Sequence, residues 1–176
     1  MTLLDTVSEL IGLRSFSNIW FWLVLAIAWS GASQRVLGVP WDMIATARRL
    51  GGEADPMAEI EELTRIHVNR LLRLVEQSGL LIAALTAFVL TSLSLLGFVY
   101  GSGFSQALFL LGFPLMLVQV LTVRTARSVR AEGARGAALI ARLARHRLMV
   151  QGLAMISIFV TAMWGMYHNM ITGGLG

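Results

Sequence analysis

The sequence contains no cysteine and no lysine, and it has few charged residues of any kind. Without cysteine the chain can form no disulfide and no thiolate-held metal or iron–sulfur site. Only 14% of its 176 residues are charged, whereas a water-soluble domain carries roughly 25%. Hydrophobic residues make up 56% of the chain, and the mean hydropathy is +0.72. The absence of cysteine excludes a secreted disulfide scaffold, and the low charge and high hydropathy indicate an integral membrane protein.

The apolar residues are gathered into four long runs. A transmembrane helix needs about 20 mostly apolar residues, and the runs cover residues 16–34, 79–100, 104–123 and 148–170. We therefore expect an all-α integral membrane protein whose transmembrane domain, residues 16–170, contains four transmembrane helices. The second helix and the segment before the fourth should extend beyond the membrane as long helical extensions.

Helical patterns also occupy the segments around these runs. Within residues 1–15, apolar side chains recur at helical spacing and predict an amphipathic helix in the membrane interface. A break at Val39-Pro40 precedes a short amphipathic helix, Trp41 to Leu50. Asp55-Pro56 is typical of a helix start, and one helix is expected from there to Tyr100. The glycine-rich residues 171–176 predict a flexible tail.

The distribution of arginine predicts the orientation in the membrane. Residues 124–147 contain seven arginines and one carboxylate, Glu132, with expected break points at glycines 133 and 136, while the turn after Tyr100 and the tail are uncharged. Cytoplasmic loops of membrane proteins carry an excess of arginine and lysine. We expect residues 35–78 and 124–147 in the cytoplasm of a bacterial inner membrane, with both termini external.

Five arginines next to the third and fourth predicted spans are candidates for contact with anionic lipid headgroups or a partner. A guanidinium group pairs bidentately with phosphate, which an ammonium group does not. The five are Arg124, Arg127, Arg142, Arg145 and Arg147. The alternative is a topogenic anchor, which needs only positive charge. We expect no nucleic-acid partner, because Trp41 is the one residue among the basic segments that could stack on a base.

Small residues on two predicted spans predict close packing of helices. Their spacing of three or four residues places each set on one helix face. They are Ser157, Thr161 and Gly165 on the fourth span, and Ala84, Ala87 and Thr91 on the second. The pattern fits contacts within one chain or between the chains of a homo-oligomer.

No catalytic or cofactor-binding pattern is present in the sequence. It lacks a glycine-rich phosphate loop, a Ser-His-Asp order and a His-Glu-x-x-His motif. No carboxylate falls within a predicted span, which argues against an ion-coupled carrier. Gln119 and Gln151 are the strongly polar side chains assigned to the spans, as hydrogen-bonding groups between helices. We expect no enzyme, cofactor or metal site.

Four stretches of the sequence resemble a small family of bacterial multi-pass membrane proteins. They are Ser15–Ser30 (SFSNIWFWLVLAIAWS), Leu37–Arg49 (LGVPWDMIATARR), Arg65–Leu72 (RIHVNRLL) and Ile156–Met170 (ISIFVTAMWGMYHNM). Members often carry the label "component of SufBCD complex", which refers to the iron–sulfur assembly machinery. The resemblance implies a membrane tether or accessory subunit of that machinery and no catalytic residue.

Two functions are predicted. The first is a non-enzymatic accessory or scaffold protein that docks partners through its cytoplasmic helices. The alternative is a homo-oligomeric channel for ions or small solutes, which a ring of polar side chains at one depth would favour.

Overall fold

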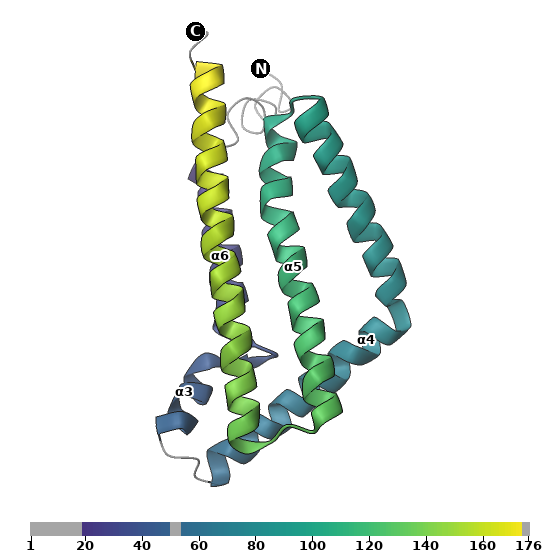
Figure 1. The fold of residues 1–176 in the computed structure, drawn as a ribbon, viewed down its shortest axis with the longest axis vertical. Coiled ribbons are helices and arrows are strands. Elements are labelled where there is room, and N and C mark those ends of the chain that lie inside the picture. The colour runs from purple at the N-terminus through teal and green to yellow at the C-terminus, as the bar shows by residue number, and fades with distance from the viewer. Residues whose placement is uncertain (1–18, 50–53, 174–176) are drawn as a thin grey trace, which may run out of the picture. The chain divides into compact units, whose positions relative to one another are not determined.

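A computed structural model describes residues 19–49 and 54–173, which form helices and one short hairpin (Figure 1). The first part consists of helix α2 (Ile19–Gln34), strands β1 (Arg35–Val36) and β2 (Val39–Pro40), and helix α3 (Trp41–Arg49). The second part consists of α4 (Ala54–Ser94), the π-helical turn η1 (Leu95–Val99), α5 (Gly103–Glu132) and α6 (Gly136–Gly173). The all-α prediction is confirmed, while the helix predicted at residues 1–15 lies outside the described residues.

Three helices are long and apolar enough to cross a membrane: Met57–Val99, Gly103–Glu132 and Gly136–His168. They contain the third predicted span and all but the last one or two residues of the second and fourth. The described part of the first predicted span is α2, whose 16 residues are fewer than the about 20 that a bilayer core requires. The first span therefore stays a prediction. α6 runs to Gly173, so the first residues of the predicted flexible tail are helical.

Contacts within the chain divide it into two units. Unit 1 comprises Met1–Trp29, Ala84–Met116 and Ala154–Gly176, and unit 2 comprises Ser30–Ala83 and Leu117–Leu153. The described residues of unit 1 include no Asp, Glu, Lys or Arg. Unit 2 contains every arginine except Arg14 and every carboxylate except Asp5 and Glu9. The division by contacts therefore coincides with a division by charge.

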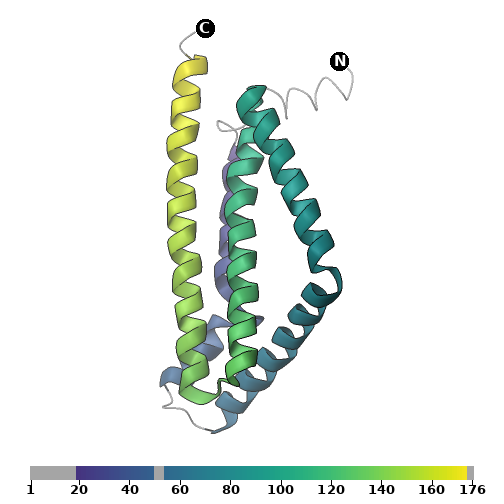
Figure 2. The ribbon, with the colours of Figure 1, turned by 45° about the vertical axis from the view of Figure 1, so that its right-hand side comes forward.

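In unit 1, a tight turn connects η1 to α5 (Figure 2). Gly101 supplies a positive φ of 74°, which a residue with a side chain rarely adopts. The backbone N–H of Ser102 donates to the carbonyl of Leu96 at 3.1 Å. Gly97 is buried, and a Cβ there would lie 2.9 Å from the backbone nitrogen of Gln106. The predicted turn is confirmed, and glycine allows the two helices to meet closely.

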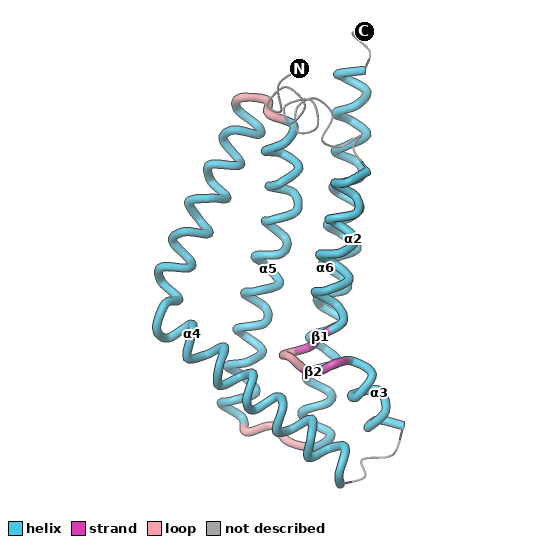
Figure 3. The backbone as a smooth tube through the Cα atoms, turned by 180° about the vertical axis from the view of Figure 1, so that it is seen from behind, coloured by secondary structure: helices cyan, strands magenta, loops and turns pink. Residues whose placement is uncertain are grey.

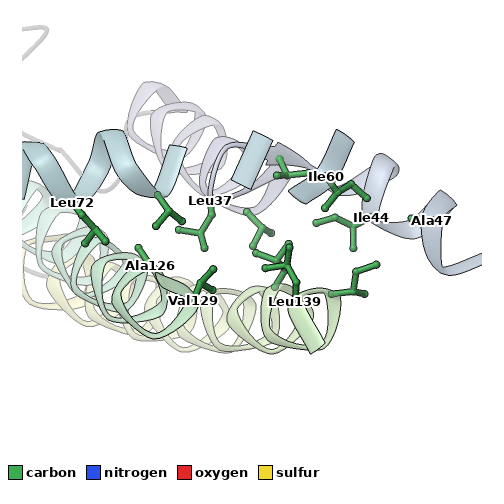
Figure 4. Close-up of a cluster of buried hydrophobic side chains, with 13 residues drawn as sticks. Leu37, Ile44, Ala47, Ile60, Leu72, Ala126, Val129 and Leu139 are labelled. Atoms are coloured by element: carbon green, nitrogen blue, oxygen red, sulfur yellow. The ribbon is translucent and has the colours of Figure 1, made fainter. Parts of the chain in front are cut away.

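Unit 2 has a hydrophobic core of its own, shown in Figure 4. Its 13 buried side chains come from the hairpin, α3, and the parts of α4, α5 and α6 that belong to this unit. Ile44, Ile60 and Leu143 are fully buried. Burial of one such side chain contributes about 1.5–3 kcal/mol, so the core stabilises the packing of these segments.

The hairpin of β1 and β2 enters this core through a strained two-residue turn (Figure 3). Leu37 and Gly38 have φ values of 49° and 82°, the positive pair required by a type I′ turn. A left-handed leucine is costly, but its side chain is only 6% exposed and belongs to the core. A Cβ at Gly38 would lie 2.1 Å from the imidazole of His67. The Val39-Pro40 pattern predicts a helix break here, and the hairpin was not predicted.

We predict that Gly38→Ala destabilises the protein by more than the cost of a positive φ alone, which is about 1 kcal/mol. The excess arises because the new methyl group must displace the ring of His67. Gly133→Ala is the matched control, since Gly133 has a φ of 57° and open space around it. Thermal unfolding in mild detergent, followed by circular dichroism, should give a larger loss of Tm for Gly38→Ala.

A second substitution separates the clash from backbone strain. His67→Ala in the Gly38→Ala background should recover the excess loss, because it removes the ring that the methyl group meets. If the double variant is no more stable than Gly38→Ala, the inference that the turn packs against His67 is wrong.

Candidate functional site

Two ion pairs join neighbouring helices of unit 2. Glu76 of α4 accepts a hydrogen bond from Arg130 of α5, with Nη2 and Oε1 2.8 Å apart. Glu132, the last residue of α5, accepts from Arg142 of α6 at 2.9 Å and from the hydroxyl of Ser128 at 3.0 Å. The hydrogen bonds from Arg142 and Ser128 lower the pKa of Glu132. Exposed pairs contribute little stability, but these two fix which helix turns meet.

The carboxylate of Glu61 caps the N-terminus of α6. Its Oε1 accepts the backbone N–H of Gly136 at 2.7 Å, where an anion also meets the positive end of the helix dipole. Helical spacing alone allows Arg65 to pair with Glu61 or with Glu62. Arg65 pairs with Glu62, at 2.8 Å, and lowers the pKa of that carboxyl. Glu61 is thereby left to hold α6.

A groove of about 440 Å³ lies in unit 2, lined by residues of α4, α5, α6 and the turn between α5 and α6. This volume falls within the range of ligand sites. Its lining mixes apolar side chains, such as Val68, Val129 and Leu139, with charged and amide side chains, such as Arg135 and Asn69. The groove can therefore receive an apolar group and a polar group together.

Two groups of this groove have no partner among the described residues. The hydroxyl of Thr64 makes no hydrogen bond although the residue is only 1% exposed. The guanidinium of Arg135 is exposed and has no ion pair there. The other lining arginines, Arg65 and Arg130, are paired with Glu62 and Glu76. The groove thus offers one unpaired positive charge, whereas the unused hydroxyl of Thr64 is buried.

His146 is buried between α5 and α6 in unit 2, with 3% of its surface exposed. The hydroxyl of Thr125 lies 2.9 Å from the carbonyl of Leu121 and 3.1 Å from Nδ1 of His146. A hydroxyl has one proton, and the carbonyl can only accept it. Nδ1–H of His146 must therefore donate to Thr125. Burial lowers the pKa of His146 and keeps the ring neutral.

The structure separates the five predicted contact arginines into two groups. Arg142 is bound to Glu132, and the guanidinium of Arg147 lies 4.0 Å from the centre of the Trp41 ring. These two stabilise unit 2 itself, through an ion pair and a cation–π contact. The other three are exposed and have no hydrogen bond or ion pair among the described residues: Arg124, Arg127 and Arg145.

The two predicted packing faces differ in exposure. The α6 residues, Ser157, Thr161 and Gly165, are buried. The α4 residues, Ala84, Ala87 and Thr91, are exposed. The most apolar stretch of α4 contains no buried residue, whereas α5 and α6 each bury part of theirs. The α4 face is therefore open to lipid or to another chain, and its packing role stays a prediction.

Gln106 is a polar residue of unit 1 that the sequence analysis missed. It is 6% exposed, donates its side-chain amide to the carbonyl of Gly97 at 2.8 Å, and accepts the indole N–H of Trp164 at 3.0 Å. It joins α5 to η1 and to α6. Its position inside the third predicted span could have identified it, because amide side chains within transmembrane helices form hydrogen bonds between helices. Gln119, which the analysis did assign, is exposed, and Gln151 is half-buried.

We predict that the stability of the protein falls as pH decreases through the range around 6.5. His146 has a pKa below its ordinary value of 6.5 in the folded protein, so protons bind the unfolded chain more readily and favour unfolding. The contribution of neutral His146 to the free energy of unfolding is fully present above pH 6.5 and is lost as the pH falls through the lowered pKa. His146→Gln keeps a donor for Thr125 but cannot titrate. Tm measured from pH 8 to pH 5.5 should fall in the wild type and stay flat in His146→Gln; parallel curves would contradict the assignment.

No protein-family model, no curated protein and no solved structure matches the chain. The likeness to the family labelled with iron–sulfur assembly stays a prediction.

Proposed function

We propose that the protein is a non-enzymatic membrane scaffold that docks a protein partner on unit 2. The observation that carries the proposal is that the charged half of the chain is folded. A chain whose only task is to cross a membrane needs short connections between spans. Here the connections form a body with a core of 13 side chains and a groove of about 440 Å³.

The free groups of the groove indicate the chemistry of the docked segment. Arg135 calls for a carboxylate, and the apolar lining calls for an aliphatic side chain. The occupant we propose is a short partner segment with an acidic residue next to apolar ones. The resemblance to proteins labelled with the iron–sulfur assembly machinery makes its subunits the first partners to test.

Placement of unit 2 in the cytoplasm belongs to the same proposal. It is supported by the gathering of all described charges in unit 2 and by the positive-inside rule. α5 has 30 residues, about 45 Å at 1.5 Å per residue, so its two ends can lie on opposite sides of a bilayer. Four spans with both termini external follow if α2 and the residues before it form the first span.

The homo-oligomeric channel is the second candidate function. The observation that favours it is the apolar stretch of α4, none of whose residues is buried. Helices from several copies packing on this stretch would bury the small residues Ala84, Ala87 and Thr91.

We predict that single cysteines report this topology. In intact cells, an impermeant thiol reagent should label Tyr100→Cys, at the turn before α5, and should not label Ala131→Cys, at its far end. Both positions are exposed, and the chain has no cysteine of its own. Lysed cells provide the control, in which both should react. Labelling of Ala131→Cys alone in intact cells would overturn the orientation.

A photo-crosslinking experiment tests the docking groove. A photo-reactive residue at Asn69, which lines the groove, should give a discrete crosslinked partner in membranes of the native host. The same residue at Arg70, which is exposed but outside the groove, should not. Mass spectrometry should map the crosslink to a segment containing an acidic residue.

A groove-filling variant supplies the matched control. Ala58→Trp places a large ring in the groove and should reduce the Asn69 crosslink at least tenfold, whereas Ala131→Trp, exposed elsewhere on unit 2, should leave it unchanged. Equal crosslinking from positions 69 and 70, or no effect of Ala58→Trp, would sink the proposed docking site.

A further inference from the structure

Three exposed and unpaired arginines of unit 2, Arg124, Arg127 and Arg145, share one side of the α5–α6 pair. The end of α5 and the beginning of α6 run antiparallel, and Thr125 faces His146 across them. In an antiparallel pair, the residues that precede two facing positions turn to the same side. Arg124 and Arg145 are those residues. Arg127, three residues after Arg124, is its neighbour on the surface of α5.

Contacts on the opposite side of the pair support this placement. The residues that follow the facing positions are Ala126 and Arg147, and these turn toward the rest of unit 2. Ala126 is fully buried in the core, and Arg147 stacks on Trp41 of α3. The side that carries Arg124 and Arg145 is therefore the outer side.

The same outer side becomes apolar one helical turn away. Val120 precedes Arg124 by four residues and is 44% exposed, while Met149 follows Arg145 by four residues and is 42% exposed. Residues four apart share a helix face. Each helix therefore presents an exposed apolar side chain beside an unpaired guanidinium, in the direction of its membrane-spanning stretch.

We propose that Arg124, Arg127 and Arg145 form a binding site for one anionic phospholipid. The guanidinium groups receive the phosphate of the headgroup through charge-assisted hydrogen bonds, and an acyl chain lies against Val120 and Met149. The lipid matches both halves of the surface, whereas a free phosphate ion would use the cationic half alone. This site is separate from the docking groove and does not depend on the proposed function.

Native mass spectrometry of the full chain in mild detergent tests the site. Wild-type protein should retain dioleoyl phosphatidylglycerol in preference to dioleoyl phosphatidylcholine. An arginine near a membrane surface is worth about 1 kcal/mol, or about fivefold in affinity. The variant Arg124→Gln, Arg127→Gln, Arg145→Gln should therefore lose up to about a hundredfold of this preference.

A charge-matched variant separates a site from bulk charge. Arg48→Gln, Arg49→Gln, Arg70→Gln also removes three exposed arginines of unit 2 and should keep the wild-type preference. Circular dichroism should show equal helix content in all three proteins. Glycerol phosphate, added at ten times the lipid concentration, should fail to displace the bound lipid, because it has no acyl chain.

Three results would overturn the proposal. They are an unchanged lipid preference in the first variant, an equal loss in the charge-matched variant, and displacement of the lipid by glycerol phosphate. The second would reduce the arginines to a general anchor, and the third would make the site one for free phosphate.

Discussion

The cost of placing a charge in hydrocarbon is the constraint on which this structure depends. A single arginine or carboxylate at the centre of a bilayer costs at least about 2.5–3.5 kcal/mol. The described part of unit 1 contains none, although α4, α5 and α6 each contribute charges to unit 2. Each of these helices is therefore apolar along one part and charged along the other. We propose that the charged parts of these helices, which form unit 2, lie outside the hydrocarbon.

Unit 2 is held together by contacts that differ from those of unit 1. Its helices surround a core that includes the side chain of Leu37, and this burial offsets a strained turn. Carboxylates then fix the helix ends, as Glu61 does at the N-terminus of α6. In unit 1, by contrast, the amide of Gln106 joins three elements without any charge. In an apolar setting an uncharged amide can form hydrogen bonds between helices, whereas a charged group there would be costly.

Much of the fold could be predicted from the sequence, because long apolar runs and glycine breaks are local signals. The continuous helix from α4 into η1, the short helix at Trp41 and the break between α5 and α6 all follow from such signals. The hairpin could not be predicted, because Leu37 adopts a positive φ only through its contacts in the core. Glu61 was likewise beyond local reasoning, since its partner Gly136 lies 75 residues away. The pairing of Arg142 and Arg147, which leaves three of the five predicted contact arginines free, also depends on tertiary contacts.

A depth scan along α5 tests most directly whether the division by charge is a division between hydrocarbon and water. Spin labels placed at successive positions of Gly103–Glu132, in liposomes, report collisions with oxygen and with a water-soluble nickel complex. Our account predicts that oxygen dominates up to about Val123 and the nickel complex from Arg124 onward, with the change within one or two helical turns. Uniform access of the nickel complex along the whole of α5 would contradict it.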